Sequence, residues 1–131
     1  MILNSYSGYF GTILGMRIYT VNGEYIRNYI DQDFVAGGNP GRYAYIPINE
    51  IWIEDTLELI DTLAIILHEI IECNYMIIDG MLYNNAHDVA NKKEKVFRKL
   101  IIKNDIDIQN KGMPEYLYYI EKFITNGNLD L

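Results

Sequence analysis

Residues 55–80, DTLELIDTLAIILHEIIECNYMIIDG, carry the pattern that decides the fold of this chain. Their apolar side chains recur with the period of an α-helix, at Leu57, Ile60, Ala64, Leu67 and Ile71. Asp55, followed three residues later by Glu58, is typical of a capped helix N-terminus. Gly80 suits the left-handed residue that ends a helix. The pattern therefore predicts a helix from Asp55 to about Ile78.

A short metal-binding motif lies in the middle of this predicted helix. His68 and Glu72 are four residues apart, one turn along the same face, so both side chains can bind one ion. In thermolysin-type motifs, the Glu next to the first ligand accepts a proton from the metal-bound water. Glu69 holds that position here, while Glu72 stands where the second His would be. We therefore predict His68 and Glu72 as metal ligands and Glu69 as a general base.

The apolar surroundings of these polar residues strengthen the hypothesis. Burying two carboxylates and an imidazole without partners costs several kcal/mol, so something must compensate their charge. A cation fits, and so does an ion-pair network that uses Arg98, Arg42 or lysines. The surrounding residues are all aliphatic, namely Ile65, Ile66, Leu67, Ile70 and Ile71.

A second predicted helix, from about residue 84 to 102, offers two candidates for a third ligand. His87 and Glu94 are seven residues apart and share one face. In an ideal antiparallel pair of helices Glu94 is nearly level with His68, while His87 lies closer to the turn. His87 reaches the ion only if the helices cross steeply or the first one ends early. Both alternatives stay open, and we expect one residue to bind the ion and the other to support a ligand from the second coordination sphere.

The first part of the chain is rich in residues that favour strands. An Asn22-Gly23 pair between two such runs, 13–21 and 24–30, predicts a β-hairpin. Residues 1–11 show no clear period and are expected to form an irregular arm or an edge strand.

Two further segments complete this part. The glycine-rich residues 37–41 predict a loop. Residues 43–47 and 50–53 read as one strand interrupted at Pro47, and the missing N–H of proline favours an edge position.

A third helix is expected from Pro114 to about Thr125. The predicted fold class is α+β, with a small N-terminal antiparallel sheet or hairpin packed on a C-terminal three-helix unit. One domain of residues 1–131 accounts for the length, with a β-rich part over 1–54 and a helical part over 55–125.

Charge and composition exclude several classes of partner. The net charge of -7 argues against nucleic acid and against an anionic membrane surface. The basic residues between Lys92 and Lys103 alternate with other types and indicate a solvated helix face. No apolar run is long enough to span a membrane, and no signal peptide is recognised.

The single cysteine, Cys73, excludes an intramolecular disulfide and favours a reducing, cytoplasmic setting. It is expected to be a core residue, with a soft metal ligand as the alternative. The abundance of Ile, Asn and Tyr is typical of AT-rich phage and viral genomes, in which case the setting is the host cytoplasm.

Several sequence blocks resemble a family of small uncharacterised bacterial, phage and viral proteins with a zincin-like motif. The blocks are IPxxEIWI at 46–53, LHExxE at 67–72 and GMxYxxAHxxANxxE at 80–94, preceded by DFVxGG at 33–38. The resemblance covers roughly residues 24–98. It implies a zincin-like fold in which five residues act together, with Glu50 also involved: His68, Glu69, Glu72, His87 and Glu94.

Three hypotheses about function follow. The first is a metal-dependent hydrolase, a zincin-like peptidase with one zinc or other divalent ion, acting on a peptide or protein that pairs with the strand over 43–53. The second is a non-catalytic viral or phage protein that binds a host factor and keeps the metal for stability, with His87 and Glu94 closing the coordination sphere. The third is a buried ion-pair network without metal.

Overall fold

The computed structural model describes residues 2–103 and 111–128. A 3₁₀-helix, η1 (Ile2–Ser5), leads into a hairpin of β1 (Tyr6–Ile13) and β2 (Met16–Val21). The turn between them is Leu14-Gly15, and both residues have positive φ, 50° and 82°. Such a turn matches the twist of a tight hairpin. β1 lies at the edge of the sheet, as one of the two alternatives for residues 1–11 predicted.

The sheet is mixed, with the strand order β1-β2-β4-β3. β4 (Glu50–Glu54) pairs in parallel with β2, and its other side pairs antiparallel with the two-residue strand β3 (Gly37–Gly38). The predicted antiparallel sheet is therefore wrong in one pairing. The edge position predicted for β4 is also wrong, since β3 covers it at Trp52 and Ile53.

The segment that connects β2 to β4 contains α1 (Gly23–Tyr29), β3 and the loops on either side of β3. The hairpin predicted at Asn22-Gly23 is wrong, because the Asn22 side chain accepts a hydrogen bond from the backbone N–H of Tyr25 and caps α1. Residues 43–47, predicted as strand, form turns. Part of the predicted loop at 37–41 forms β3 instead.

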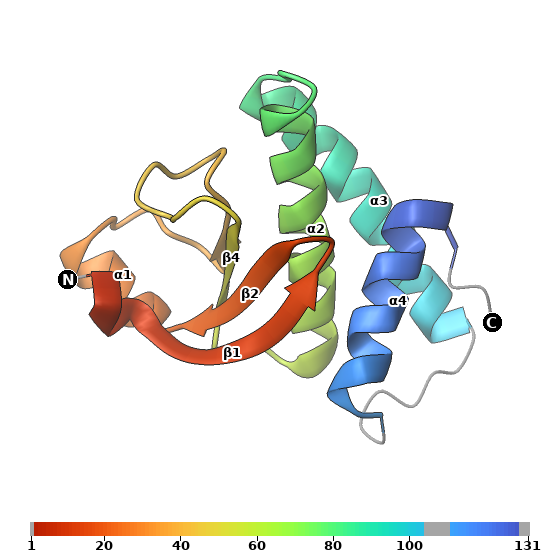
Figure 1. The fold of residues 1–131 in the computed structure, drawn as a ribbon, viewed down its shortest axis with the longest axis horizontal. Helices are drawn as coiled ribbons and strands as arrows, with labels where there is room; N and C mark the ends of the chain where they lie inside the picture. The colour runs from red at the N-terminus through yellow and green to blue at the C-terminus, as the bar shows by residue number, and fades with distance from the viewer. Residues whose placement is uncertain (1, 104–110, 129–131) are drawn as a thin grey trace.

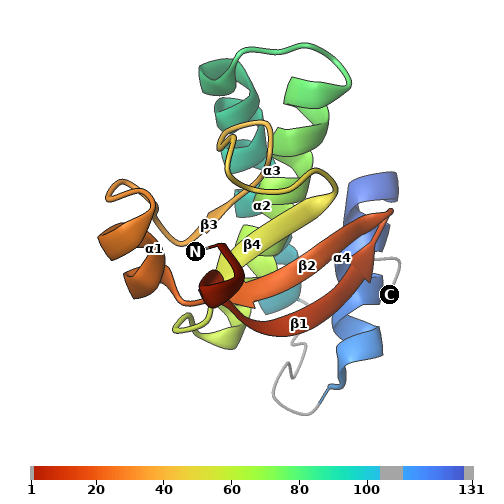
Figure 2. The same cartoon turned by 60° about the vertical axis from the view of Figure 1, so that its left-hand side comes forward.

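Three long helices lie on one side of the sheet: α2 (Leu59–Ile77), α3 (Tyr83–Lys103) and α4 (Met113–Asn126). Figure 1 shows α2 next to the sheet, with α3 and α4 packed on it, and Figure 2 shows α1 on the other side of the strands. All three helices were predicted. The capped start at Asp55 was wrong, since α2 begins after Glu58, which makes no side-chain capping bond.

Two cores lie on the two faces of the sheet. Ile51 and Ile53 of β4 point to the helices and join the larger core. Trp52, between them in sequence, points to α1 and joins Val21, Ile26, Phe34 and Ile46. β4 is buried on both faces, which is typical of a strand with a parallel neighbour. The fold is thus α+β, and α2 is held between the sheet and α3.

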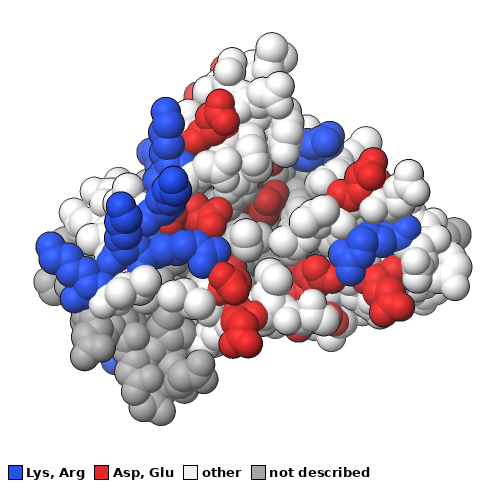
Figure 3. Space-filling model, turned by 180° about the vertical axis from the view of Figure 1, so that it is seen from behind, with Lys and Arg blue, Asp and Glu red and all other residues white. Residues whose placement is uncertain are grey.

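Lysines of α3 are exposed, as the sequence predicted. Figure 3 shows basic side chains gathered on this side of the molecule, with acidic side chains next to them. Within residues 2–103 and 111–128, no helix is both long and apolar enough to cross a membrane.

Candidate metal centre

The centre of α2 carries three buried polar residues, His68, Glu69 and Glu72. They lie where the helix faces both the loop after β3 and the first turns of α3. The apolar residues around them belong to the larger core, so the helix is fixed on its other sides. The polar side chains therefore gather in one place between three elements.

Three ligand atoms from this region point toward one another. His68 Nε2 lies 3.1 Å from Glu72 Oε2 and 3.2 Å from His87 Nδ1, and the last two atoms are 2.7 Å apart. In a tetrahedral zinc site with bonds of ~2.0–2.1 Å, neighbouring ligand atoms are ~3.3 Å apart. The three atoms therefore have nearly the spacing of one face of such a site. In the described part of the chain, these residues form the one group of three His, Cys, Asp or Glu side chains whose ligand atoms lie close enough together for a metal ion.

The two nitrogens of the His68 ring explain how both candidates on α3, His87 and Glu94, contact it. Its Nε2 faces His87, while its Nδ1–H donates to Glu94 Oε1 at 3.0 Å. α2 ends at Ile77 and α3 begins at Tyr83, so the connection is short and His87 lies near the turn. The geometry thus brings His87 next to His68 and Glu72, and these three candidate ligands are called the ligand group below. Glu94 lies on the opposite side of the His68 imidazole.

Glu94 is itself held in place by a chain of ion pairs. Arg98 Nε donates to Glu94 Oε2 at 2.9 Å, and Arg98 Nη1 donates to Asp61 Oδ1 at 2.7 Å. A carboxylate that accepts the second N–H of a ligand histidine fixes the ring and its tautomer. Glu94 occupies that position, and Arg98 links it back to the start of α2.

Asn39, which was not among the predicted site residues, contacts both carboxylates of α2. Its Nδ2 donates to Glu69 Oε1 at 3.0 Å and to Glu72 Oε1 at 3.1 Å, and the residue is 0% exposed. Its Oδ1 accepts from the backbone N–H groups of Gly41 and Arg42. The only signal was a polar residue inside the Gly37–Gly41 breaker cluster, which is equally typical of an ordinary turn.

Glu69 lies beside the ligand group without joining it. Its Oε2 is 4.0 Å from His68 Nε2, and its Oε1 is occupied by Asn39. Burial raises the pKa of Glu69 to about 7, and the neighbouring Glu72 carboxylate adds to the rise. A buried carboxyl with a pKa near neutrality can take up or release a proton at physiological pH.

At His68 and Glu72, in contrast to Glu69, hydrogen bonds to neighbouring groups favour the charged form more than burial disfavours it. Burial by itself lowers the pKa of His68, but the acceptors Glu72 and Glu94 outweigh it and raise the pKa to about 10. Burial raises the pKa of Glu72, but hydrogen bonds from the two imidazoles hold it below its usual range. In the protein without metal, a proton on His68 therefore neutralises Glu72 at pH 7.

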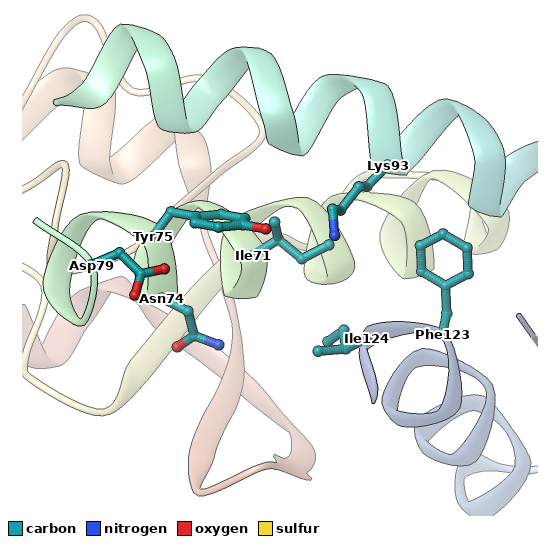
Figure 4. A pocket seen from close by; sticks show the side chains of 7 residues that line it. All are labelled: Ile71, Asn74, Tyr75, Asp79, Lys93, Phe123 and Ile124. Carbon is teal, nitrogen blue, oxygen red and sulfur yellow. The ribbon is translucent and has the colours of Figure 1, made fainter. Parts of the chain in front are cut away.

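A cleft of about 290 Å³ opens next to the ligand group, and Glu69, Glu72, Tyr83 and His87 lie in its wall. The Tyr83 hydroxyl is 3.5 Å from His87 Nδ1. A second pocket of about 220 Å³ lies between α2, α3 and α4 (Figure 4). Its charged residues are Asp79 and Lys93, and it contains none of the ligand group.

Two residues singled out in the sequence lie away from the cluster. Glu50 points to the opposite face of the sheet, where it accepts hydrogen bonds from the Tyr6 hydroxyl and the Trp52 indole. Cys73 is buried in the larger core, outside the ligand group.

No family model matches the chain, and comparison with curated proteins and with solved structures likewise found no match. The resemblance to zincin-like proteins therefore stays a prediction.

Proposed function

We propose that the protein is a metal-dependent hydrolase of the zincin-like peptidase type. In this proposal His68, Glu72 and His87 hold one divalent ion and Glu69 is the general base. The observation that carries it is the convergence of three ligand atoms, with separations of 2.7–3.2 Å, beside a second carboxylate, that of Glu69, in the wall of a cleft.

The donor set supports zinc more than the short motif did. Two imidazoles and one carboxylate are the ligands of catalytic zinc in thermolysin and carboxypeptidase A. Glu72 replaces a histidine on α2, but His87 on α3 supplies the second imidazole. The composition of the site is thus the same, with histidine and glutamate exchanged between the helices.

Each residue has a separate task in this proposal. Glu94 accepts the Nδ1–H of His68, so that Nε2 presents its lone pair to the ion. Glu69 accepts a proton from the attacking water and then passes it to the leaving group. Asn39 holds the carboxylates of Glu69 and Glu72 in place by donating to one oxygen of each. The ion supplies Lewis acidity, which activates water and polarises a carbonyl group.

A Glu69→Gln variant tests the proposal together with metal analysis. The wild-type protein is expected to bind one zinc ion and to cleave peptides in an unrelated peptide mixture analysed by mass spectrometry. The variant should keep the metal and lose cleavage by about a hundredfold or more, since general bases contribute ~10²–10⁴.

A matched control is Glu121→Gln, which changes an exposed carboxylate on α4 in the same way. It should leave both metal content and cleavage unchanged. A wild-type protein that does not bind metal stoichiometrically would end the proposal.

A further inference from the structure

The cleft beside the ligand group is lined by one arginine, Arg42, and by no lysine among the described residues. Its guanidinium carbon lies 4.4 Å from the ring centroid of Tyr83 and 5.1 Å from that of Tyr43. Two aromatic rings thus support the planar cation and restrict its orientation. The residue itself is exposed, so the cation is accessible from the cleft.

The ion pairs distinguish Arg42 from the other arginines. Arg17, Arg27 and Arg98 each lie within 4.0 Å of a carboxylate. Within residues 2–103 and 111–128, no such ion pair joins Arg42 to an acidic side chain. Besides its hydrogen bond to Tyr83, a guanidinium that is held by aromatic rings and not paired with a carboxylate has further N–H groups for a ligand.

The loop that carries Arg42 also connects it to the metal centre. The backbone N–H of Arg42 donates to Asn39 Oδ1 at 3.1 Å, and the same amide group contacts Glu69 and Glu72. On the other side, Tyr83 lies between Arg42 and His87, with ring centroids of Tyr83 and His87 5.2 Å apart. The cation is therefore fixed one aromatic ring away from a predicted ligand.

We infer that Arg42 binds a carboxylate of the substrate, so that the cleft selects peptides with an anionic group near the bond that is cleaved. This inference rests on the proposed metal site. The carboxylate can be a free C-terminus or an acidic side chain, since both present the same planar pair of oxygens.

Hydroxamates with and without a carboxylate test the inference. The zinc-loaded protein is titrated calorimetrically with succinic, glutaric and adipic monohydroxamate, and with the matching primary amides of each. We expect at least one carboxylate compound to bind about tenfold or more tightly than its amide, because hydrogen bonds to charged groups are the stronger ones. Arg42→Gln should abolish this difference, and Arg42→Lys should restore only part of it.

Lys99→Gln is the matched control, because it removes one positive charge from an exposed position on α3. It should retain the preference of the wild type. Thermal melting of each variant establishes that it is folded.

The outcomes separate the two proposals. Zinc binding without a preference for the carboxylate compounds, or a preference that survives Arg42→Gln, overturns this inference alone. A protein that binds no zinc overturns the proposed function and this inference with it. Competition by peptides with free or amidated C-termini, and with Glu or Gln side chains, then shows which source of carboxylate Arg42 prefers.

Discussion

Two buried glutamates on opposite faces of the sheet have very different partners. Glu50 is 7% exposed and Glu72 is 2% exposed. Glu50 Oε1 accepts from the Tyr6 hydroxyl at 2.6 Å and from the Trp52 indole at 3.0 Å, and its Oε2 faces Arg17 at 3.5 Å. All three partners are permanent donors at neutral pH.

Glu72 shares its Oε2 with two imidazoles, whose protons are exchangeable for a metal ion. Burial of a carboxylate is therefore not by itself a sign of a metal site. The difference lies in the neighbours of each oxygen. Permanent donors satisfy both oxygens of Glu50, whereas at Glu72 only Oε1 has such a donor, Asn39, and the two imidazoles beside Oε2 can themselves become ligands.

The largest effect is expected from the same substitution at the two glutamates. Glu72→Gln removes a proposed ligand and should lower zinc affinity by at least about a hundredfold, because neutral amides are poor zinc ligands and even the loss of a residue that hydrogen-bonds to a ligand costs ~10–100-fold. Glu50→Gln should leave zinc affinity unchanged. Isothermal titration calorimetry measures both, and equal losses in the two variants would contradict the distinction.

The next largest loss of zinc affinity is expected from Glu94, which accepts the hydrogen bond of His68 Nδ1–H. Glu94→Gln replaces the acceptor of the Nδ1–H and should lower zinc affinity by about 10–100-fold. Competition with a zinc-binding dye provides the measurement, with Glu121→Gln as the exposed control. An affinity equal to that of the wild type would show that Glu94 does not orient the ring.

Zinc affinity should also rise with pH. His68 has a pKa of about 10 in the metal-free protein, so zinc must displace a proton from Nε2 below that pH. Affinity is expected to rise about tenfold per pH unit from pH 6 to 8. Proton release, measured by calorimetry in buffers of different ionisation enthalpy, checks the same point. An affinity that does not change with pH would contradict a role for His68 Nε2.

The same pKa predicts the pH dependence of stability without metal. The folded-state pKa of His68 lies above its ordinary value of 6.5, so protonation favours the folded state. This stabilisation is complete below pH 6.5 and is lost as the pH rises through about 10. Urea unfolding of metal-free protein at pH 7 and 10 measures the loss. The loss should be absent in His68→Gln, and a decline of equal size in that variant would assign it to other groups.

The smallest change in zinc affinity is expected from substitutions of the residues that donate hydrogen bonds to Glu50 and Glu72. Tyr6→Phe removes a donor to Glu50 and should destabilise the fold by about 1–3 kcal/mol with no change in zinc affinity. Asn39→Ala should cost about the same stability and also weaken zinc binding, since it frees Glu72 Oε1. Urea unfolding with and without zinc distinguishes the two.

The helices were predictable because their signals are local. The apolar period of α2, the proline at the start of α4 and Gly80, with its φ of 70°, each act within a few residues. In the β-rich part, local patterns also indicated β2 and β4. The connection after β2 was not predictable, because Asn22 can occupy a hairpin turn or cap a helix with the same side chain. The parallel pairing of β2 with β4 depends on residues far apart in the chain, which no local pattern encodes.

The candidate site divides in the same way. His68, Glu69 and Glu72 follow from the spacing on one helix. The choice between His87 and Glu94 did not follow from ideal helix geometry, because an imidazole has two nitrogens and the structure uses both. Asn39 was not predictable as part of the site, since a loop residue acquires such a role only when the tertiary fold places it. Arg42 was named from the sequence as a possible ion-pair partner of the carboxylates, and within residues 2–103 and 111–128 it makes no such pair.

Calorimetric titration of metal-free wild-type protein with zinc at pH 7 tests the central claim most directly. The convergence of His68, Glu72 and His87 predicts saturable binding of one ion per chain, with release of a proton from His68. If no saturable binding is observed, and the melting temperature is the same with zinc and with chelator, the cluster is an ion-pair network and the metal centre is contradicted.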